Sequence, residues 1–121
     1  MASRLSEGFR ERTKGFATLV IRLYVSIPKN REEVRVCGKQ LLRSGTSVAA
    51  HVREASRARS DQEFIAKIGI ALQEVDESCL WLELLHEECG LPGETIAPLK
   101  SEANELLAIL SSMISRTTQR L

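Results

Sequence analysis

The sequence predicts an all-α protein, an antiparallel up-down four-helix bundle in a single domain of residues 1–121. Apolar residues recur at helical spacing over most of the chain, and no stretch alternates with period two over the length of a strand. Prolines and glycines cluster at "SIPKN" and "CGLPG", where helices are expected to end. Ser60 followed by Glu63, ahead of an apolar run, is a capping box that starts another helix. The four helices are therefore expected at about 6–27, 31–58, 61–89 and 94–118.

Each expected helix has an apolar face that can join a common core. In the third helix the residues of this face step alternately by four and three, which is a heptad pattern over nearly four repeats. They are Phe64, Ile68, Ala71, Val75, Ser78, Leu82, Leu85 and Cys89. The fourth helix continues the pattern with Ile96, Leu99, Ala103, Leu106, Leu110 and Met113. The first two helices contribute Phe9, Phe16, Leu19, Leu23, Ile27, Val34, Leu41, Gly45, Val48, Val52 and Ala55.

The second helix carries small residues where helices usually carry larger ones, and most of them lie in "QLLRSGTSVAAHVREASRARSDQEF", residues 40–64. They are Gly38, Ser44, Gly45, Ala49, Ala50 and Ala55. A glycine inside a helix costs about 1 kcal/mol relative to alanine, so the two glycines indicate that a neighbouring helix approaches closely. Two interpretations remain open: tight packing inside the bundle, or a specific subunit contact that includes Gly45.

Composition excludes several classes of protein. Five aromatic residues are too few for a base-stacking platform, and no apolar run reaches the roughly 18 residues of a membrane span. The charged N-terminus lacks the apolar core of an export signal, so a cytoplasmic protein without membrane contact is expected. Three cysteines without CxxC spacing indicate no disulfide framework.

The net charge of +1 hides a strong asymmetry along the chain. Residues 1–60 hold 13 Lys/Arg against 5 Asp/Glu, whereas residues 61–121 hold 4 against 11, so the halves carry +8 and −7. At 100° per residue, six basic residues share one sector of the second helix. They are Arg31, Arg35, Lys39, Arg43, Arg53 and Arg57. This basic stripe is either a solvated face or the site of an anionic partner, which would be nucleic-acid phosphates or an acidic helix of a neighbouring subunit.

The third helix has apolar residues outside its core-facing seam. Leu80, Trp81 and Leu84 lie among acidic residues on the side away from the core, where such a set indicates a protein contact. One stray surface leucine would need no explanation, but three neighbours predict a subunit interface.

No arrangement of residues indicates catalysis. Cys79, His86 and Cys89 share a face of the third helix, but Cys79 and His86 are about 10 Å apart along the axis, too far to share one zinc ion directly. His51 has no nucleophile or cleft partner in the sequence that would make it a general base. Nucleotide-binding, hydrolase and metalloprotease motifs are absent from the sequence. We therefore expect no enzyme activity, no metal, no cofactor and no small-molecule substrate.

The segment "QLLRSGTSVAAHVREASRARSDQEFIAKIGIALQEVDE" resembles a bacterial four-helix-bundle family. That family comprises the intervening-sequence proteins encoded within large-subunit ribosomal RNA genes and the Avd-like accessory proteins of diversity-generating retroelements. The matching positions are Gln40, Leu41, Arg43, Ser47, Val52, Glu54, Ser60, Glu63 and Phe64. The resemblance implies an all-α subunit without catalytic residues that assembles into a ring-like oligomer, typically a pentamer. It implies binding to nucleic acid or to a reverse transcriptase only for strongly basic members.

Together these observations favour a non-enzymatic, homo-oligomeric helical scaffold or adapter protein. The alternative is an accessory protein that binds nucleic acid or a reverse transcriptase through the basic stripe.

Overall fold

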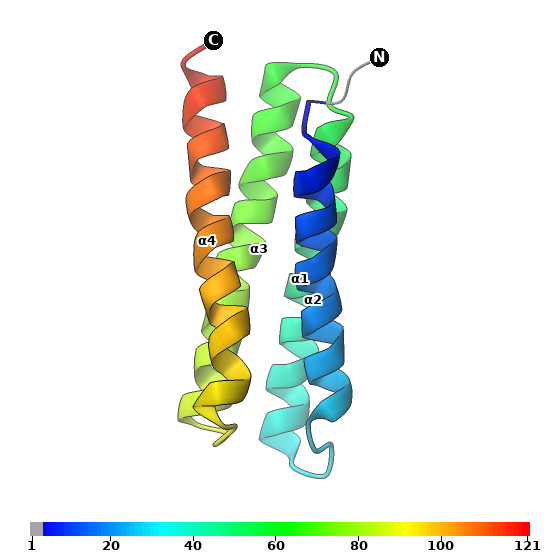
Figure 1. The fold of residues 1–121 in the computed structure, drawn as a ribbon, viewed down its shortest axis with the longest axis vertical. Helices are drawn as coiled ribbons and strands as arrows, with labels where there is room; N and C mark the ends of the chain where they lie inside the picture. The colour runs from blue at the N-terminus through cyan, green and yellow to red at the C-terminus, as the bar shows by residue number, and fades with distance from the viewer. Residues whose placement is uncertain (1–3) are drawn as a thin grey trace.

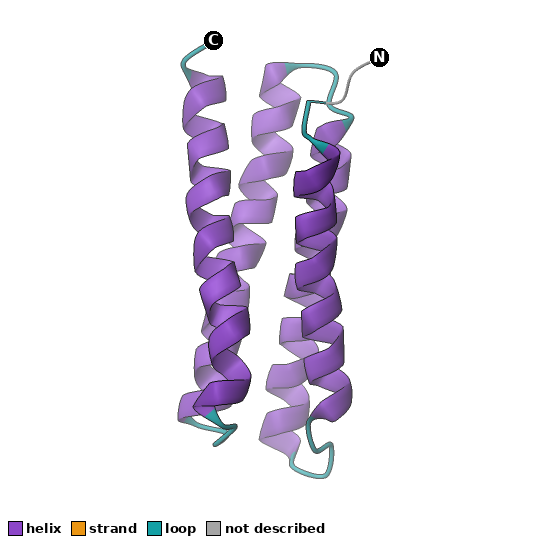
Figure 2. Cartoon of the chain, viewed as in Figure 1, coloured by secondary structure: helices purple, strands orange, loops and turns teal. Residues whose placement is uncertain are grey.

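The computed structural model describes residues 4–121 as four helices, and no strand occurs in this range (Figures 1 and 2). The helices are α1 (Glu7–Ser26), α2 (Glu32–Ser56), α3 (Asp61–Glu87) and α4 (Gly93–Thr118). Successive helices run in opposite directions along one long axis (Figure 1). The predicted all-α four-helix architecture is confirmed, with boundaries within two residues of those expected. Residues 1–3, the start of the predicted domain and of the charged N-terminus, lie outside the described range.

Local signals set where the helices begin and end. The Ser60 hydroxyl accepts a hydrogen bond from the backbone N–H of Glu63 at 3.0 Å, so the predicted cap begins α3. Ser6 caps α1 in the same way, through the N–H of Phe9 at 3.1 Å. Gly90, after the end of α3, has a φ of 77°, a left-handed conformation that glycine adopts without strain.

The core consists mainly of the predicted apolar faces. All eight predicted seam residues of the third helix are buried, although Cys89 lies just beyond the end of α3, and the six predicted core residues of α2 are buried too. In α4 the predicted residues are buried except Met113, which packs against the core while half-buried. Phe9 of α1 is half-buried in the same way. One hydrophobic cluster therefore draws on all four helices.

The prediction for Leu19 is wrong, because this side chain is 38% exposed whereas Val20 is fully buried. The buried positions of α1 include Thr13, Phe16 and Val20, which turn its inner face toward α2. Leu19 is seven residues after Arg12, which pairs with α4, so both lie on the α4 side of α1. α1 and α4 contact each other only sparsely, whereas α2 packs extensively on α1 and α3. Leu19 is exposed because few side chains of α4 reach it.

The two glycines of α2 are explained by the closeness of α1. A Cβ atom built on Gly45 would lie 2.7 Å from Cγ2 of Val20, and one on Gly38 would lie 2.5 Å from Cδ1 of Ile27. Gly45 is buried inside its own chain by this contact. This burial against α1 accounts for Gly45 by tight packing inside the bundle, without a subunit contact.

Ser44, the residue before Gly45, is turned about 100° from it around α2 and faces α3. Its hydroxyl is 2.8 Å from the hydroxyl of Ser78, and both residues are fully buried. Each hydroxyl also reaches a backbone carbonyl of its own helix, at Leu41 and Glu74. This buried pair favours one register between the two helices, since a shift along the axis would break the contact between the hydroxyls and leave each with only the carbonyl of its own helix.

One ion pair joins the sparsely packed helices α1 and α4. The guanidinium of Arg12 binds the carboxylate of Glu102 through two hydrogen bonds of 2.8 Å, and it also reaches Glu105 at 3.2 Å. The Arg12 and Glu102 side chains are 35% and 22% exposed, so water screens their interaction only in part. Within residues 4–121, no helix is long and apolar enough to cross a membrane.

Gly45→Leu should lower the free energy of unfolding by roughly 1–3 kcal/mol, because the added side chain must displace the buried Val20. The matched control is Gly15→Leu, since a Cβ atom at Gly15 meets nothing within 4 Å. The control should be neutral or slightly stabilising, because leucine is the better helix former. Urea denaturation of both variants measures the difference, and equal stabilities would refute the close contact.

Arg12→Gln and Glu102→Gln, made singly and together, should give a coupling free energy of about 0.5–1 kcal/mol at low salt. The coupling should shrink as ionic strength rises, because the pair is partly exposed. Thermal unfolding of the four proteins measures it. Strictly additive effects would mean that this pair does not hold α1 to α4.

Candidate functional site

The six residues of the predicted basic stripe on α2 fall into two groups. Three already have carboxylate partners within the chain: Arg31 with Glu33, Arg35 with Glu32, and Arg43 with Glu74 and Glu77 of α3. The hydrogen bond from Arg35 lowers the pKa of the Glu32 carboxyl. The other three, Lys39, Arg53 and Arg57, have no carboxylate within 4 Å among the described residues. Only half of the stripe is therefore left without a partner.

Arg53 and Arg57 line a hollow of about 380 Å³ between α1 and α2. α1 contributes Arg10 and Lys14 to this hollow, and α2 also contributes the small residues Ala49 and Ala50. The basic hollow is this space with its four basic side chains, Arg10, Lys14, Arg53 and Arg57. Because α1 and α2 are antiparallel, the start of α1 lies beside the end of α2, which brings two basic pairs from distant parts of the sequence together (Figure 1).

Glu54 is the acidic residue at the rim of the basic hollow, and it is already engaged. Its carboxylate accepts a hydrogen bond of 2.8 Å from the Lys67 ammonium of α3, and this bond lowers the pKa of the Glu54 carboxyl. None of the four cations of the basic hollow has a carboxylate within 4 Å in the described part of the chain. The hollow thus keeps a positive charge that the protein itself does not neutralise.

Arg10 is the least solvated cation of the hollow. Its Nε atom is buried and has no hydrogen-bond partner within the described residues. Sequence reasoning missed both Arg10 and Lys14. Their spacing of four residues on the first helix was the available signal, but only the pairing of α1 with α2 shows that they face Arg53 and Arg57.

The predicted interface residues of α3 differ in exposure. Leu80 is 46% exposed, whereas Trp81 and Leu84 are half-buried, and Trp81 packs partly on the core. Asp76 and Glu87 of the same helix are exposed and have no ion pair within the described residues. This outer α3 patch, comprising Leu80, Trp81, Leu84, Asp76 and Glu87, is apolar with an acidic border.

α1 has a second outward apolar patch, which sequence reasoning also missed. Ile21 and Val25 are 45% and 76% exposed, and between them lies the exposed Arg22, which has no ion pair within residues 4–121. This outer α1 patch comprises Ile21, Arg22 and Val25. The available signal in the sequence was the spacing of four residues between Ile21 and Val25, which places both on one side of the helix. Only the burial of Val20 shows that this side faces away from the core.

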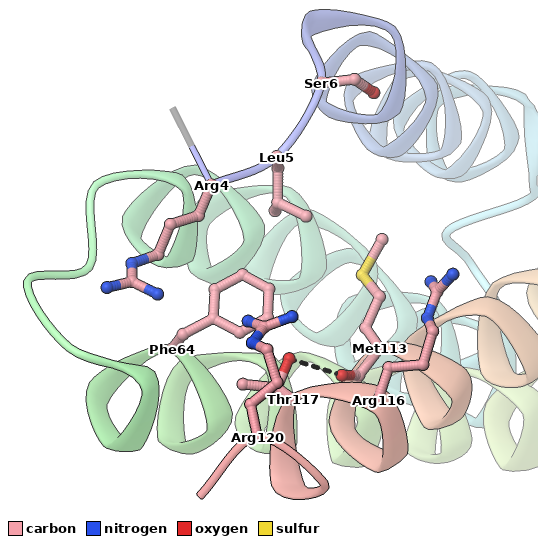
Figure 3. Close-up of a pocket in the computed structure, with 8 residues that line it drawn as sticks. All are labelled: Arg4, Leu5, Ser6, Phe64, Met113, Arg116, Thr117 and Arg120. Atoms are coloured by element: carbon pink, nitrogen blue, oxygen red, sulfur yellow. Dashed lines mark hydrogen bonds between the residues drawn. The ribbon is translucent and has the colours of Figure 1, made fainter. Parts of the chain in front are cut away.

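A further hollow of about 450 Å³ lies at the end of the bundle near both described termini (Figure 3). Figure 3 shows Leu5, Phe64 and Met113 within it, with Arg4, Arg116 and Arg120 around them. Arg4 and Arg120 both pair with Asp61, and their hydrogen bonds lower the pKa of that carboxyl. Asp61 therefore offsets one of the three positive charges around this hollow.

The cysteines and histidines have structural surroundings. Cys79 and Cys89 are buried, and burial raises the pKa of both thiols. Nδ1 of His51 lies 2.9 Å from the Ser47 carbonyl oxygen, and Nδ1 of His86 lies 2.8 Å from that of Leu91, so each ring can donate to the backbone. No group of three His, Cys, Asp or Glu side chains that could hold a metal ion occurs in residues 4–121.

Comparison with known proteins gives a consistent relationship. The profile of one family, described as 23S rRNA-intervening sequence protein, matches residues 7–112. A crystal structure of a protein of unknown function from the S23 ribosomal protein family of Bacteroides thetaiotaomicron VPI-5482 superposes with a TM-score of 0.80 at 36% sequence identity. The match covers 87% of this chain and 96% of the other. No match is found among curated proteins.

The family profile spans the four helices almost from end to end, and a solved structure from a ribosomal S23 family has the same fold at substantial identity. The chain therefore belongs to the family of 23S rRNA-intervening sequence proteins.

Proposed function

We propose that this protein is a non-enzymatic scaffold or adapter that assembles with copies of itself into a ring. The observation that supports this proposal is the complementarity between the outer α3 patch and the outer α1 patch. Both expose aliphatic side chains, at Leu80 on one helix and at Ile21 and Val25 on the other. The first is bordered by unpaired carboxylates and the second contains an unpaired arginine, so opposite charges would meet when one copy docks on the next.

The positions of the two patches suit a head-to-tail contact between parallel copies. Each lies toward the C-terminal end of its helix, and α1 and α3 run in the same direction. α1 and α3 lie diagonally across the bundle and do not pack directly on each other, so their outer faces point away from each other. When the α3 patch of one copy docks on the α1 patch of another, the resulting dimer still has one free α1 patch and one free α3 patch. Further copies can therefore bind at both ends until the first and last subunits meet.

Subunits can close into a ring only if the angle between the two patches, measured around the long axis of the bundle, is less than 180°. Ile21 is seven residues after Lys14, which lines the hollow shared with α2, so Ile21 leans toward α2. Leu84 is seven residues after Glu77, which pairs with Arg43 of α2, so Leu84 leans toward α2 as well. Both patches thus turn toward the same helix, which favours a closed ring over a straight filament. Five subunits are favoured by the family resemblance.

Nucleic-acid or reverse-transcriptase binding along the whole basic stripe has less support. Three of its six residues, Arg31, Arg35 and Arg43, have carboxylate partners within the chain. An extended phosphate backbone on α2 would have to compete with these partners over much of the helix.

Light scattering should give a molar mass several times the 13.5 kDa of one chain at micromolar concentration. Leu80→Glu combined with Val25→Glu should reduce the mass to that of the monomer, because each patch would then carry a new buried charge. Circular dichroism should show that helix content is kept, since both residues are exposed. Ser111→Glu, which adds one negative charge at an exposed position on α4, is the matched control and should assemble normally.

A wild-type protein that remains monomeric at high micromolar concentration would rule out the ring. An oligomer that keeps its mass in the double variant would move the interface away from these two patches.

A further inference from the structure

We propose that the basic hollow between α1 and α2 is a binding site for a phosphate group, with Arg10, Lys14, Arg53 and Arg57 as its ligands. The ligand class is a phosphomonoester or diphosphate, which carries two or more negative charges. This inference goes beyond the proposed assembly and does not depend on it.

The electrostatics of the hollow favour an anion. Arg10 and Lys14 are four residues apart on α1, and Arg53 and Arg57 are four residues apart on α2. Like charges at this spacing destabilise a helix by a few tenths of a kcal/mol each, and here two such pairs border one hollow. Glu54 also lines the hollow, but its carboxylate is bound to Lys67, and none of the four cations forms an ion pair of 4 Å or less with a carboxylate of the described residues. An anion in the hollow would remove both repulsions at once.

The hydrogen bonding of Arg10 points to the same conclusion. Buried polar atoms almost always have a partner, and the Nε–H of Arg10 is buried without one, so a phosphate oxygen could bond it only if the Arg10 side chain shifts toward the hollow on binding. Arg10 is half-buried, so its guanidinium is less able to turn into bulk water than that of an exposed arginine. A tetrahedral oxyanion can accept several hydrogen bonds from guanidinium groups at once, which matches an unpaired arginine beside two others.

The shape of the hollow limits the size of the ligand. A volume of about 380 Å³ holds a diphosphate or a small phosphorylated molecule, and it is the small side chains of Ala49 and Ala50 on its lining that leave this space. The unpaired cations of α2 at this end span one turn, from Arg53 to Arg57, and the next basic residue along the helix, Arg43, is bound to Glu77. This is a local site rather than a track, so a terminal phosphate or diphosphate fits it better than a nucleic-acid backbone.

The site is separate from the patches proposed for assembly. Arg10 and Lys14 lie in the first half of α1, whereas Ile21 and Val25 lie toward its other end. Loss of phosphate binding and loss of assembly can therefore be observed independently.

Calorimetric titration of the wild-type protein with inorganic pyrophosphate, in buffer free of divalent metal, should give saturable binding and a higher Tm. Arg10→Gln combined with Arg53→Gln should weaken binding by about tenfold or more, because two charge-assisted hydrogen bonds are lost. Ala50→Leu keeps every charge and fills the hollow, so it should also weaken binding. Lys39→Gln removes an unpaired cation of α2 outside the hollow and should leave binding unchanged. Light scattering should give the same mass for all four proteins.

Three results would overturn the proposal: no saturable pyrophosphate binding up to millimolar concentration, wild-type binding by the Arg10/Arg53 double variant, or equal weakening by Lys39→Gln. Binding that survives Ala50→Leu would also overturn it, since only diffuse attraction ignores the shape of the hollow. A single-stranded oligonucleotide provides the second arm. If it displaces pyrophosphate and depends on the same arginines, the site binds phosphate but the ligand is a nucleic-acid backbone, which overturns the proposed ligand class; if it does not compete, a small phosphorylated ligand is the source.

Discussion

The close approach of α1 to α2 at two glycines is the contact on which the other features of this protein depend. A Cβ atom on Gly45 would lie within 3.1 Å of three side-chain atoms of Val20, whereas one on Gly38 would come that close only to the terminal Cδ1 of Ile27, so Gly45 makes the stricter contact. These contacts set the rotation of α1 about its own axis. With Val20 inward, Ile21 and Val25 are left outside, and Arg10 and Lys14 turn toward the end of α2. A glycine in the middle of a helix lowers its stability relative to alanine. Two glycines in α2 therefore indicate that close packing against α1 stabilises the fold by more than they cost.

The second determinant of the surface is how charge is distributed after folding. The excess of basic residues in the first half of the chain and of acidic residues in the second half is partly cancelled where the halves meet, at Arg12–Glu102 and Arg43–Glu77. What remains is separated in space. Unpaired cations line the basic hollow, and unpaired carboxylates border the outer α3 patch. The proposed phosphate site uses the unpaired cations and the proposed assembly uses the unpaired carboxylates, and the two proposals share no residue.

Much of the fold was predictable from the sequence, because period and capping act locally. The heptad seam of α3 and the cap at Ser60 depend on residues within a few positions of one another, and both are confirmed. The core face of α1 was less predictable. Leu19 and Val20 are adjacent apolar residues, and only the unequal packing of α1 on α2 and α4 decides which one points inward.

The candidate sites were predictable only in part, since they combine residues from different helices. The basic stripe on α2 was visible as a pattern, but the loss of Arg43 to Glu77 and the addition of Arg10 and Lys14 depend on how helices pair. Gly45 illustrates the same limit. The sequence indicates that something packs closely against this glycine, but it does not distinguish a helix of the same chain from a second subunit.

The most direct test of the central contact is a double-mutant cycle between Gly45→Ala and Val20→Ala, with the free energy of unfolding measured by urea denaturation. In Gly45→Ala alone, the higher helix propensity of alanine offsets part of the free energy lost to the clash with Val20. The same propensity gain is present with and without Val20, so it cancels when the coupling free energy is calculated. The added Cβ atom should be tolerated much better once the γ carbons of Val20 are removed, which predicts a favourable coupling free energy of at least about 1 kcal/mol. Additive effects of the two substitutions would contradict the claim that this contact determines how α1 sits on α2.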